Sequence, residues 1–286
     1  MQLTANVYVE TGFPGANVGY VTTGDGVVMI DTPNRPTDAV AWRREMEEKG
    51  PIKYLFNLEP HFDHCDGNFI FTATAVAHEK TREAMQAIDI KKTIENIASI
   101  DPDGASLIGK SQFNIPSVTF SERLTLYLGS HSFHLMHLPG HTAGQTAVFV
   151  PEERVVFTAD NVTYRQQGFL PDAEPFSWLE SLQKIGGLEV DYIVPGHGEV
   201  CDKSYLKEQA KFIQDCIDAV RPAFDRGWTR EEAVERVSWP DYLPVEPGTE
   251  EMARQLKRLG ILRLYDVLSR RQPVPQDGGN QSASSG

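Results

Sequence analysis

The chain has 286 residues, of which 40% are hydrophobic and 23% charged, so it is long and apolar enough for one large α/β layered domain with a substantial core. Its net charge of −13 argues against nucleic acid as a partner, because phosphate backbones are bound by clustered Lys and Arg. No long apolar run and no basic, then apolar, N-terminus occur, so we expect neither a membrane span nor a signal peptide. Three widely spaced cysteines fit a reducing compartment, and we expect a cytoplasmic protein.

The first third of the chain alternates predicted strands and helices. Residues 18–32 read as two apolar β-rich runs around a Gly-Asp-Gly turn, which indicates a hairpin. Pro36 opens a predicted helix that stops at Gly50. Short strands are predicted over 52–59 and 73–79, with the polar stretch 60–68 between them.

Residues 89–117 are polar, small and without clear periodicity. We expect them to form an insertion or lid loop, with a turn at the Asp-Pro-Asp-Gly sequence that starts at Asp101. Strands then return over 118–120, 124–129, 131–138, 146–150 and 155–160. A helix is predicted near 178–187, and a strand over 191–194.

The chain becomes helical after residue 202. Helical spacing covers 204–224 and 250–271, and Thr229 with Glu232 predicts a capping box. The tail, 272–286, is rich in Pro, Gly and Ser and is expected to be disordered. We therefore expect a main domain over 1–201, a helical extension over 202–271 packed on the same domain, and a disordered tail.

Metal-ligating residue types gather directly after the predicted strand 52–59. Glu59, His61 and Asp63 alternate, and an extended backbone would point them to one side; His64 follows at once. Three later segments each place one further ligand at a strand end, and these ligands are His141, Asp160 and His197. Oxygen and nitrogen donors in this number can serve two adjacent metal ions.

The order of these motifs resembles the metallo-β-lactamase superfamily. The first motif of that family, His-x-His-x-Asp-His, is matched by "EPHFDH", in which Glu59 replaces the first His. The later motifs are matched by "PGHT" at 139–142, "FTADN" at 157–161 and "VPGHG" at 194–198. The match covers roughly residues 5–200, and four motifs in the right order make it specific.

This resemblance implies an α/β fold, the αββα sandwich with added C-terminal helices, and the activity of a hydrolase with a binuclear metal site. It puts Glu59, His61 and His141 around the first metal. It puts Asp63, His64 and His197 around the second, with Asp160 bridging both. Asp31 falls where the family often keeps an Asp beneath the site, so we expect it to orient ligands by hydrogen bonds.

Glu59 is the departure from the family pattern. Three carboxylates leave two divalent ions at a net charge of about +1, so bound water should ionise less readily than in the site with a first His. Zinc is the expected metal, because carboxylates are ordinary zinc ligands. Iron or manganese stays open because of the added oxygen ligand. Glu59 could also swing away and leave only the site of Asp63, His64 and His197 filled.

Several other residues are candidates for a chemical or a structural role. Asp63 is expected to hold the bridging water or to accept its proton, and Tyr164 to polarise a carbonyl oxygen. Asn161 could face substrate. Cys65 is interpreted as a packing residue in spite of its position beside a ligand. A structural role is expected for His131, His134 and His137, the last of which lies near the "PGHT" loop.

The function indicated is attack of a metal-bound hydroxide on a small-molecule ester, lactone or related acyl bond. Residues 89–117 and the C-terminal helices are expected to form the pocket wall. Two alternatives stay open, namely a non-haem iron oxygenase or redox enzyme on the same ligands, and a non-catalytic metal-binding module. The expected partner is a small-molecule substrate, without nucleic acid or membrane, and the apolar final helix could serve a homodimer.

Overall fold

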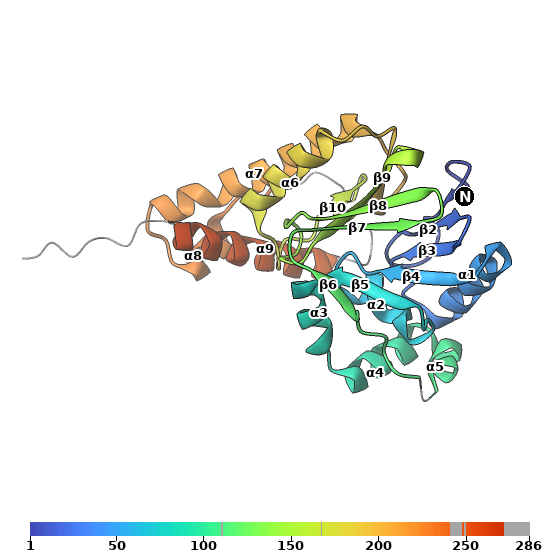
Figure 1. The fold of residues 1–286 in the computed structure, drawn as a ribbon. Coiled ribbons are helices and arrows are strands. Elements are labelled where there is room, and N and C mark those ends of the chain that lie inside the picture. The colour runs from blue at the N-terminus through green and yellow to red at the C-terminus, as the bar shows by residue number, and fades with distance from the viewer. Residues whose placement is uncertain (110, 167, 241–247, 249, 272–286) are drawn as a thin grey trace, which may run out of the picture.

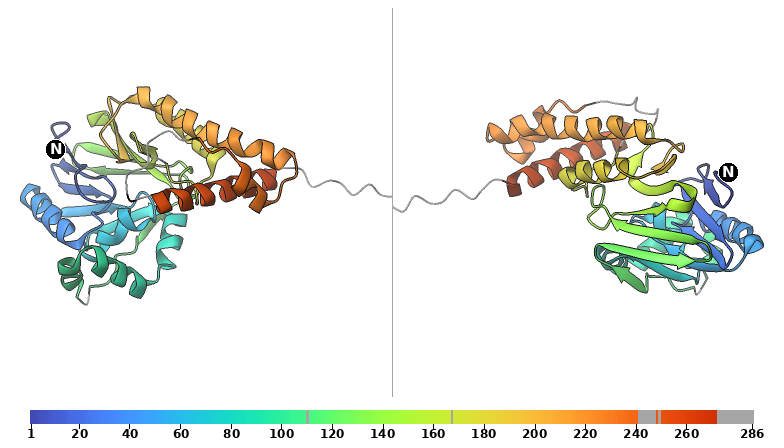
Figure 2. Two further views of the ribbon diagram at one scale, coloured as in Figure 1. Left: turned by 180° about the vertical axis from the view of Figure 1, so that it is seen from behind. Right: turned by 45° about the horizontal axis from the view of Figure 1, so that its top comes forward.

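The computed structural model describes residues 1–109, 111–166, 168–240, 248 and 250–271. Two β-sheets lie face to face, and helices cover the outer face of each (Figure 1). The views from behind and from above show the same layers, with α6 and α7 over one sheet, α8 and α9 packed against α7, and α1 and α3–α5 over the other sheet (Figure 2). This confirms the predicted αββα sandwich.

The first sheet has six strands in the order in which they occur in the chain. Its strands are β1 (Val7–Glu10), β2 (Val18–Thr23), β3 (Gly26–Ile30), β4 (Ile52–Phe56), β5 (Thr74–His78) and β6 (Val118–Phe120). The predicted hairpin is confirmed as β2 and β3, which pair antiparallel with Thr23 opposite Gly26. The strands from β3 to β6 pair parallel, so the carboxyl ends of β4 and β5 lie at one edge.

The second sheet has five strands in the order β11-β10-β9-β8-β7. They are β7 (Arg123–Leu128), β8 (His131–His137), β9 (Thr146–Val150), β10 (Val155–Thr163) and β11 (Tyr192–His197). β10 and β11 pair parallel, with register shifts on either side of Ala159. Ala159 has a φ of 41°, an uncommon conformation for a residue other than Gly, and it directly precedes the expected ligand Asp160.

Nine α-helices lie within the described residues. They are α1 (Pro36–Lys49), α2 (Phe62–Cys65), α3 (Glu79–Gln86), α4 (Ile90–Ile100), α5 (Pro102–Ile108), α6 (Pro175–Gly186), α7 (Leu206–Asp225), α8 (Arg230–Arg236) and α9 (Glu250–Arg271). The predicted helix from Pro36 is confirmed as α1, and Gly50 follows its last residue. The capping box of Thr229 and Glu232 is confirmed at the start of α8.

Three apolar cores hold the layers together. The core between the sheets contains alternating strand residues from both, such as Val28, Phe56 and Phe133. α1 packs Trp42 and Met46 against the outer face of the first sheet. On the outer face of the second sheet, α6 and α7 pack against β10, and buried residues of α8 and α9 continue the same core, so the C-terminal helices share a core with the β-sandwich. None of the described helices combines the length and the apolar character that a membrane-spanning helix needs.

The expectation of a loop over 89–117 is wrong, because most of this segment is helical. Asp89 accepts hydrogen bonds from the first turn of α4, and Asp101 accepts one from Gly104 in α5, so both are N-caps. Pro102, interpreted above as part of a turn, is the first residue of α5. Apolar residues of both helices enclose Phe69. The expected tail, 272–286, lies outside the described residues.

Candidate metal centre

The seven expected ligands come from five segments that meet at one edge of the sandwich. Glu59 and His61 lie between β4 and α2, Asp63 and His64 lie in α2, and His141 lies between β8 and β9. Asp160 lies in β10, and His197 is the last residue of β11. The alternation expected for Glu59, His61 and Asp63 breaks at Phe62, where α2 begins. The helical turn therefore directs Asp63 and His64 to a second group of donors.

The first group of donors consists of Glu59, His61 and His141. Glu59 Oε2 lies 2.6 Å from Nδ1 of His61 and 3.3 Å from Nε2 of His141. The two imidazole nitrogens, His141 Nε2 and His61 Nδ1, are 3.0 Å apart. One ligand atom of each residue lies within 4.8 Å of the others, so a single divalent cation fits this donor set.

The second group consists of Asp63, His64 and His197, whose ligand atoms again lie within 4.8 Å of one another. Asp63 Oδ2 and Nε2 of His197 are 3.2 Å apart. His64 is fully buried, whereas Asp63 and His197 are partly exposed. Solvent or a substrate can therefore approach this group from the side of Asp63 and His197.

Asp160 lies between the two groups. Its Oδ1 is 3.2 Å from Nε2 of His64, and its Oδ2 is 3.4 Å from Nε2 of His197 and 3.6 Å from Nε2 of His141. Asp160 would therefore be the carboxylate placed to contact a cation held by either group. Glu59 also extends to both groups, because its Oε1 is 3.5 Å from Nε2 of His64.

Opposite charges dominate the electrostatics of this edge. Burial raises the pKa of Glu59, but the neighbouring imidazoles outweigh burial and hold this pKa well below its usual value. Burial lowers the pKa of His61 and of His197, but carboxylates outweigh it and raise each pKa to about 10. The buried carboxylates therefore favour positive charge at this edge, which is the electrostatic requirement for a cation site.

Buried partners outside the two groups fix the orientation of the ligands. Asp31 Oδ2 lies 2.8 Å from Nδ1 of His64, as the resemblance implies for this position. Gln145 donates from Nε2 to Glu59 Oε1 over 3.2 Å. Asn161 is fully buried, accepts from the backbone N–H of His141 and donates to the carbonyl of Leu138, so its side chain holds the loop and does not face a substrate.

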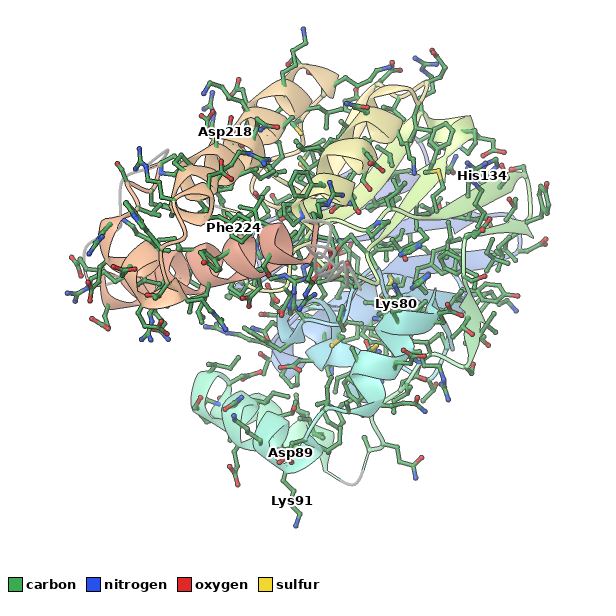
Figure 3. All side chains as sticks on the ribbon, turned by 90° about the vertical axis from the view of Figure 1, so that its left-hand side faces the viewer. Lys80, Asp89, Lys91, His134, Asp218 and Phe224 are labelled. Atoms are coloured by element: carbon green, nitrogen blue, oxygen red, sulfur yellow. The ribbon has the colours of Figure 1, made fainter. Side chains whose placement is uncertain are left out.

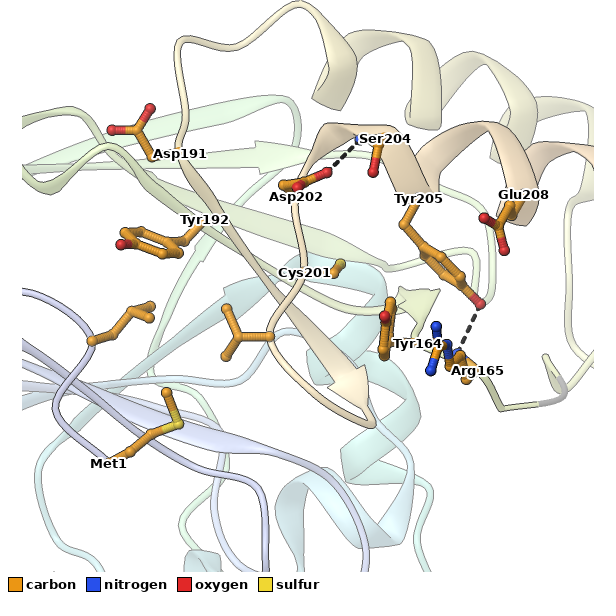
Figure 4. A pocket seen from close by; sticks show the side chains of 12 residues that line it. Met1, Tyr164, Arg165, Asp191, Tyr192, Cys201, Asp202, Ser204, Tyr205 and Glu208 are labelled. Carbon is orange, nitrogen blue, oxygen red and sulfur yellow. Dashed lines mark hydrogen bonds between the residues drawn. The ribbon is translucent and has the colours of Figure 1, made fainter.

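Tyr164 does not join the cluster. Its ring packs on Tyr205 with centroids 4.7 Å apart, in a pocket that also contains Met1, Arg165 and Cys201 (Figure 4). None of the seven expected ligands lines this pocket. Tyr164 follows the last residue of β10, and its backbone N–H donates to the carbonyl of His197 while its ring packs in this separate pocket.

Cys65, His131 and His137 have structural partners. Cys65 is buried and its Sγ donates to the carbonyl of Pro60; burial holds the pKa of its thiol well above the usual value. His131 pairs with Glu153 at 2.8 Å. His137 stacks on His78 with ring centroids 3.8 Å apart and donates to the carbonyl of Ala143. All three cysteines are free.

Two residues that the sequence analysis missed support the site. Asp172 Oδ2 lies 3.2 Å from Nε2 of His61, on the side of the ring opposite Glu59. Asn17 donates from Nδ2 to the carbonyls of Pro195 and Gly198 and so clamps the turn that carries His197. Neither residue belongs to a quoted motif, so only their long-range contacts identify them.

A cavity of about 430 Å³ adjoins the first group of donors. It is lined by Pro60, His61, Lys80, Ala84, Thr142, Ala143, Gly144 and Asp172. Lys80 lies at the start of α3, on the face shown in Figure 3. The lining of this cavity comes from α3 and from the loops around His61, His141 and Asp172. The expectation that 89–117 and the C-terminal helices form the pocket wall stays a prediction.

A sandwich of two sheets with a double cluster of His and carboxylate donors at its edge defines a class of metal-dependent hydrolases. The metallo-β-lactamase superfamily model matches residues 11–197, and the chain belongs to this superfamily. The solved metallo-β-lactamase from Pontibacter korlensis has a similar fold, with a TM-score of 0.59 and 21% identity over 75% of this chain and 98% of that one.

Two curated relatives are more similar in sequence. The α subunit of 2,4-dinitroanisole O-demethylase from a Nocardioides species is 29% identical over 60% of this chain. A hydroxyacylglutathione hydrolase from Brucella anthropi is 25% identical over 79% of this chain. The chain spans 49% of the length of the O-demethylase subunit and 75% of the length of the hydrolase. The predicted family, fold and hydrolase class are thereby confirmed.

Proposed function

We propose that this protein hydrolyses an ester, lactone or related acyl bond of a small molecule, with two divalent metal ions held by the seven ligands. The observation that carries the proposal is the position of Asp160, within 3.6 Å of imidazole nitrogens from both groups. Zinc is the proposed metal, because imidazole and carboxylate are its ordinary ligands. When bound, such ions would supply an ionised water and polarise the oxygen that gains charge.

The residues of this chain have distinct tasks in the proposal. Asp63 is the candidate to hold the attacking water or to accept its proton, because its carboxylate is partly exposed and lies 3.2 Å from His197 in the second group. Asp31 and Gln145 hold His64 and Glu59 in orientation from the buried side. Tyr164 has no part in this mechanism, because it lies in a different pocket.

The size and chemistry of the adjoining cavity support a small-molecule substrate. Its volume of about 430 Å³ lies within the range of small-ligand sites, roughly 300 to 1,000 Å³. Lys80 contributes a positive charge to the lining. Thr142, Ala143 and Gly144 contribute one hydroxyl group and small apolar surfaces beside His61. The relative named as a hydroxyacylglutathione hydrolase acts, by its name, on an acyl compound.

The first experiment is metal analysis of protein purified without added metal, followed by a panel of esters, lactones, thioesters and β-lactams with that metal restored. We expect two equivalents of metal and turnover of at least one acyl substrate. Asp63→Asn should then lower kcat by about 10²-fold or more while the fold is retained. Absence of turnover of every substrate in the panel would refute the proposed hydrolase activity.

Glu59 keeps the two alternatives open, and each has its own measurement. Iron in anaerobically purified protein together with substrate-dependent oxygen uptake would favour a non-haem iron enzyme over a hydrolase. Turnover that appears only in a Glu59→His variant would favour a non-catalytic metal-binding module as the natural state.

A further inference from the structure

The short segment that precedes α6, residues 168–174, holds the first group of ligands from outside the sandwich; we call it the strap. The carbonyl of Phe169 accepts a hydrogen bond from Nδ1 of His141 over 2.9 Å. Asp172 Oδ2 lies 3.2 Å from Nε2 of His61. The ring of Phe169 packs against both imidazoles, with centroids 5.6 Å and 5.8 Å away.

These contacts fix which nitrogen of each ring faces the first group. His141 donates its Nδ1–H to the strap, so its Nε2 is left to face Glu59. His61 has the reverse arrangement, with Nε2 toward Asp172 and Nδ1 toward Glu59. A hydrogen bond from the outer nitrogen of a ligating imidazole orients the ring and increases its basicity as a ligand.

The C-terminal helix α9 holds the strap in place. Arg263 donates from Nε to the carbonyl of Ala173 over 2.7 Å and pairs through Nη2 with Glu174 at 2.6 Å. Leu170 and Ala173 are buried in the same core as Ile261 of α9. A guanidinium that binds two groups of one segment restricts both its position and its direction.

The second group has a different support. His64 is oriented by Asp31, which directly follows β3 and is buried. Neither the strap nor α9 supplies a contact to Asp63, His64 or His197 among the described residues. The imidazoles of His61 and His141 are therefore oriented from outside the ligand cluster by a different part of the fold from the one that orients His64.

We propose that the strap, anchored by Arg263, is a positioning element that sets metal affinity at the first group independently of the second. This inference rests on the proposed two-metal site and adds a role for the C-terminal helix. Removal of one strap contact should loosen the imidazoles of His61 and His141. The ligands around Asp31 and His64 should keep their geometry.

The test is a zinc titration of the full chain after metal removal, by competition with a chromophoric chelator. Asp172→Asn and Arg263→Met should each weaken one of two zinc equivalents by about 10- to 100-fold and leave the other unchanged. Arg230→Met is the matched control, because Arg230 also pairs with α9, at Asp266, but does not touch the strap. It should leave both affinities unchanged.

A variant in the second group of ligands shows which of the two bound zinc ions is weakened in the strap variants. His197→Gln should weaken the other equivalent, and the double variant with Asp172→Asn should weaken both. Thermal melts of each variant identify any that fails to fold; Asp172 is a surface residue, with 62% of its side chain exposed, so Asp172→Asn should fold. Equal weakening of both equivalents, or unchanged affinity in Asp172→Asn, would overturn the proposal.

The outcome is separable from that of the proposed function. A selective loss of one equivalent without turnover of any acyl substrate would support the strap and contradict the hydrolase. The opposite result would be acyl-substrate turnover by a wild type that binds two equivalents of zinc, with both zinc affinities weakened equally in the two strap variants. That result would support the hydrolase and contradict the strap.

Discussion

Asp31 Oδ2 lies 2.8 Å from Nδ1 of His64, and Asp31 Oδ1 accepts the backbone N–H of Leu58 over the same distance. Asp31 has a φ of 53°, a conformation that Asp and Asn adopt more readily than most other residues with a side chain. Its carboxylate thus joins the end of β3 to a ligand of the second group. The backbone accepts an uncommon conformation at the point where this contact is made.

Asp31→Asn should therefore weaken metal binding at the second group by about 10- to 100-fold without loss of the fold. The amide keeps the backbone conformation but removes the negative charge that stabilises His64 as a ligand. Chelator competition measures the affinity. Asp25→Asn, in the turn between β2 and β3, is the control and should bind metal as the wild type does; equal affinities in both variants would refute the prediction.

Glu59→His should move the acidic limb of the kcat/KM profile to lower pH by on the order of one unit. The substitution removes one negative charge from the site, so water bound to the metals ionises more readily. The pH–rate profile of a substrate found in the panel is the measurement. Glu59→Gln removes the same charge with little change of shape and should shift the limb in the same direction; an unmoved limb in both variants would contradict the charge argument.

Gly196→Ala should disrupt the site through packing alone. A Cβ at Gly196 would lie 1.8 Å from Oδ1 of Asp160 and 2.6 Å from the carbonyl carbon of Ala159. Relief of this overlap must displace Asp160, so we expect a loss of roughly 1–3 kcal/mol of stability and loss of metal binding. Urea unfolding and zinc titration measure the two effects. Gly24→Ala, where a Cβ meets no atom within 4 Å, should leave both unchanged.

The stacked pair of His78 and His137 should contribute a pH-dependent term to stability. Burial lowers the pKa of both rings, the proximity of His137 lowers that of His78 further, and Lys80 opposes a positive charge on either. Because these pKa values are lowered in the folded protein, the unfolded chain binds the protons first as the pH falls. The contribution is present above the unfolded pKa of about 6.5 and is lost as the pH falls through the folded values.

His137→Phe keeps a ring against His78 and removes one of the two titrating imidazoles. Between about pH 7.5 and about pH 5.5, its Tm should therefore fall less than that of the wild type, although its Tm at the higher pH is lower because the bond to Ala143 is lost. His134→Phe, on the same strand but outside the pair, should keep the pH dependence of the wild type. An identical dependence in His137→Phe would show that the stacked pair has no such effect.

The sequence by itself determined the local features of this protein. The β2–β3 hairpin follows from its Gly-Asp-Gly turn, α1 from Pro36 and Gly50, and the first turn of α8 from Thr229 and Glu232, because each depends on neighbours in the chain. The candidate ligands were also visible in sequence, since strand ends and glycines mark them. The segment 89–117 was misread, because a cap and a first-turn proline have the same residue types as a turn.

Only the tertiary structure decided which side chains surround each ligand. Asp172 is 111 residues from His61 in the chain, and Arg263 reaches the strap from the last helix, so no local pattern could connect them. The single helical turn at Phe62 divides Glu59 and His61 from Asp63 and His64, and Tyr164 lines a separate pocket with Tyr205. Such assignments depend on the packing of two sheets and their covering helices, which brings together groups that the chain keeps far apart.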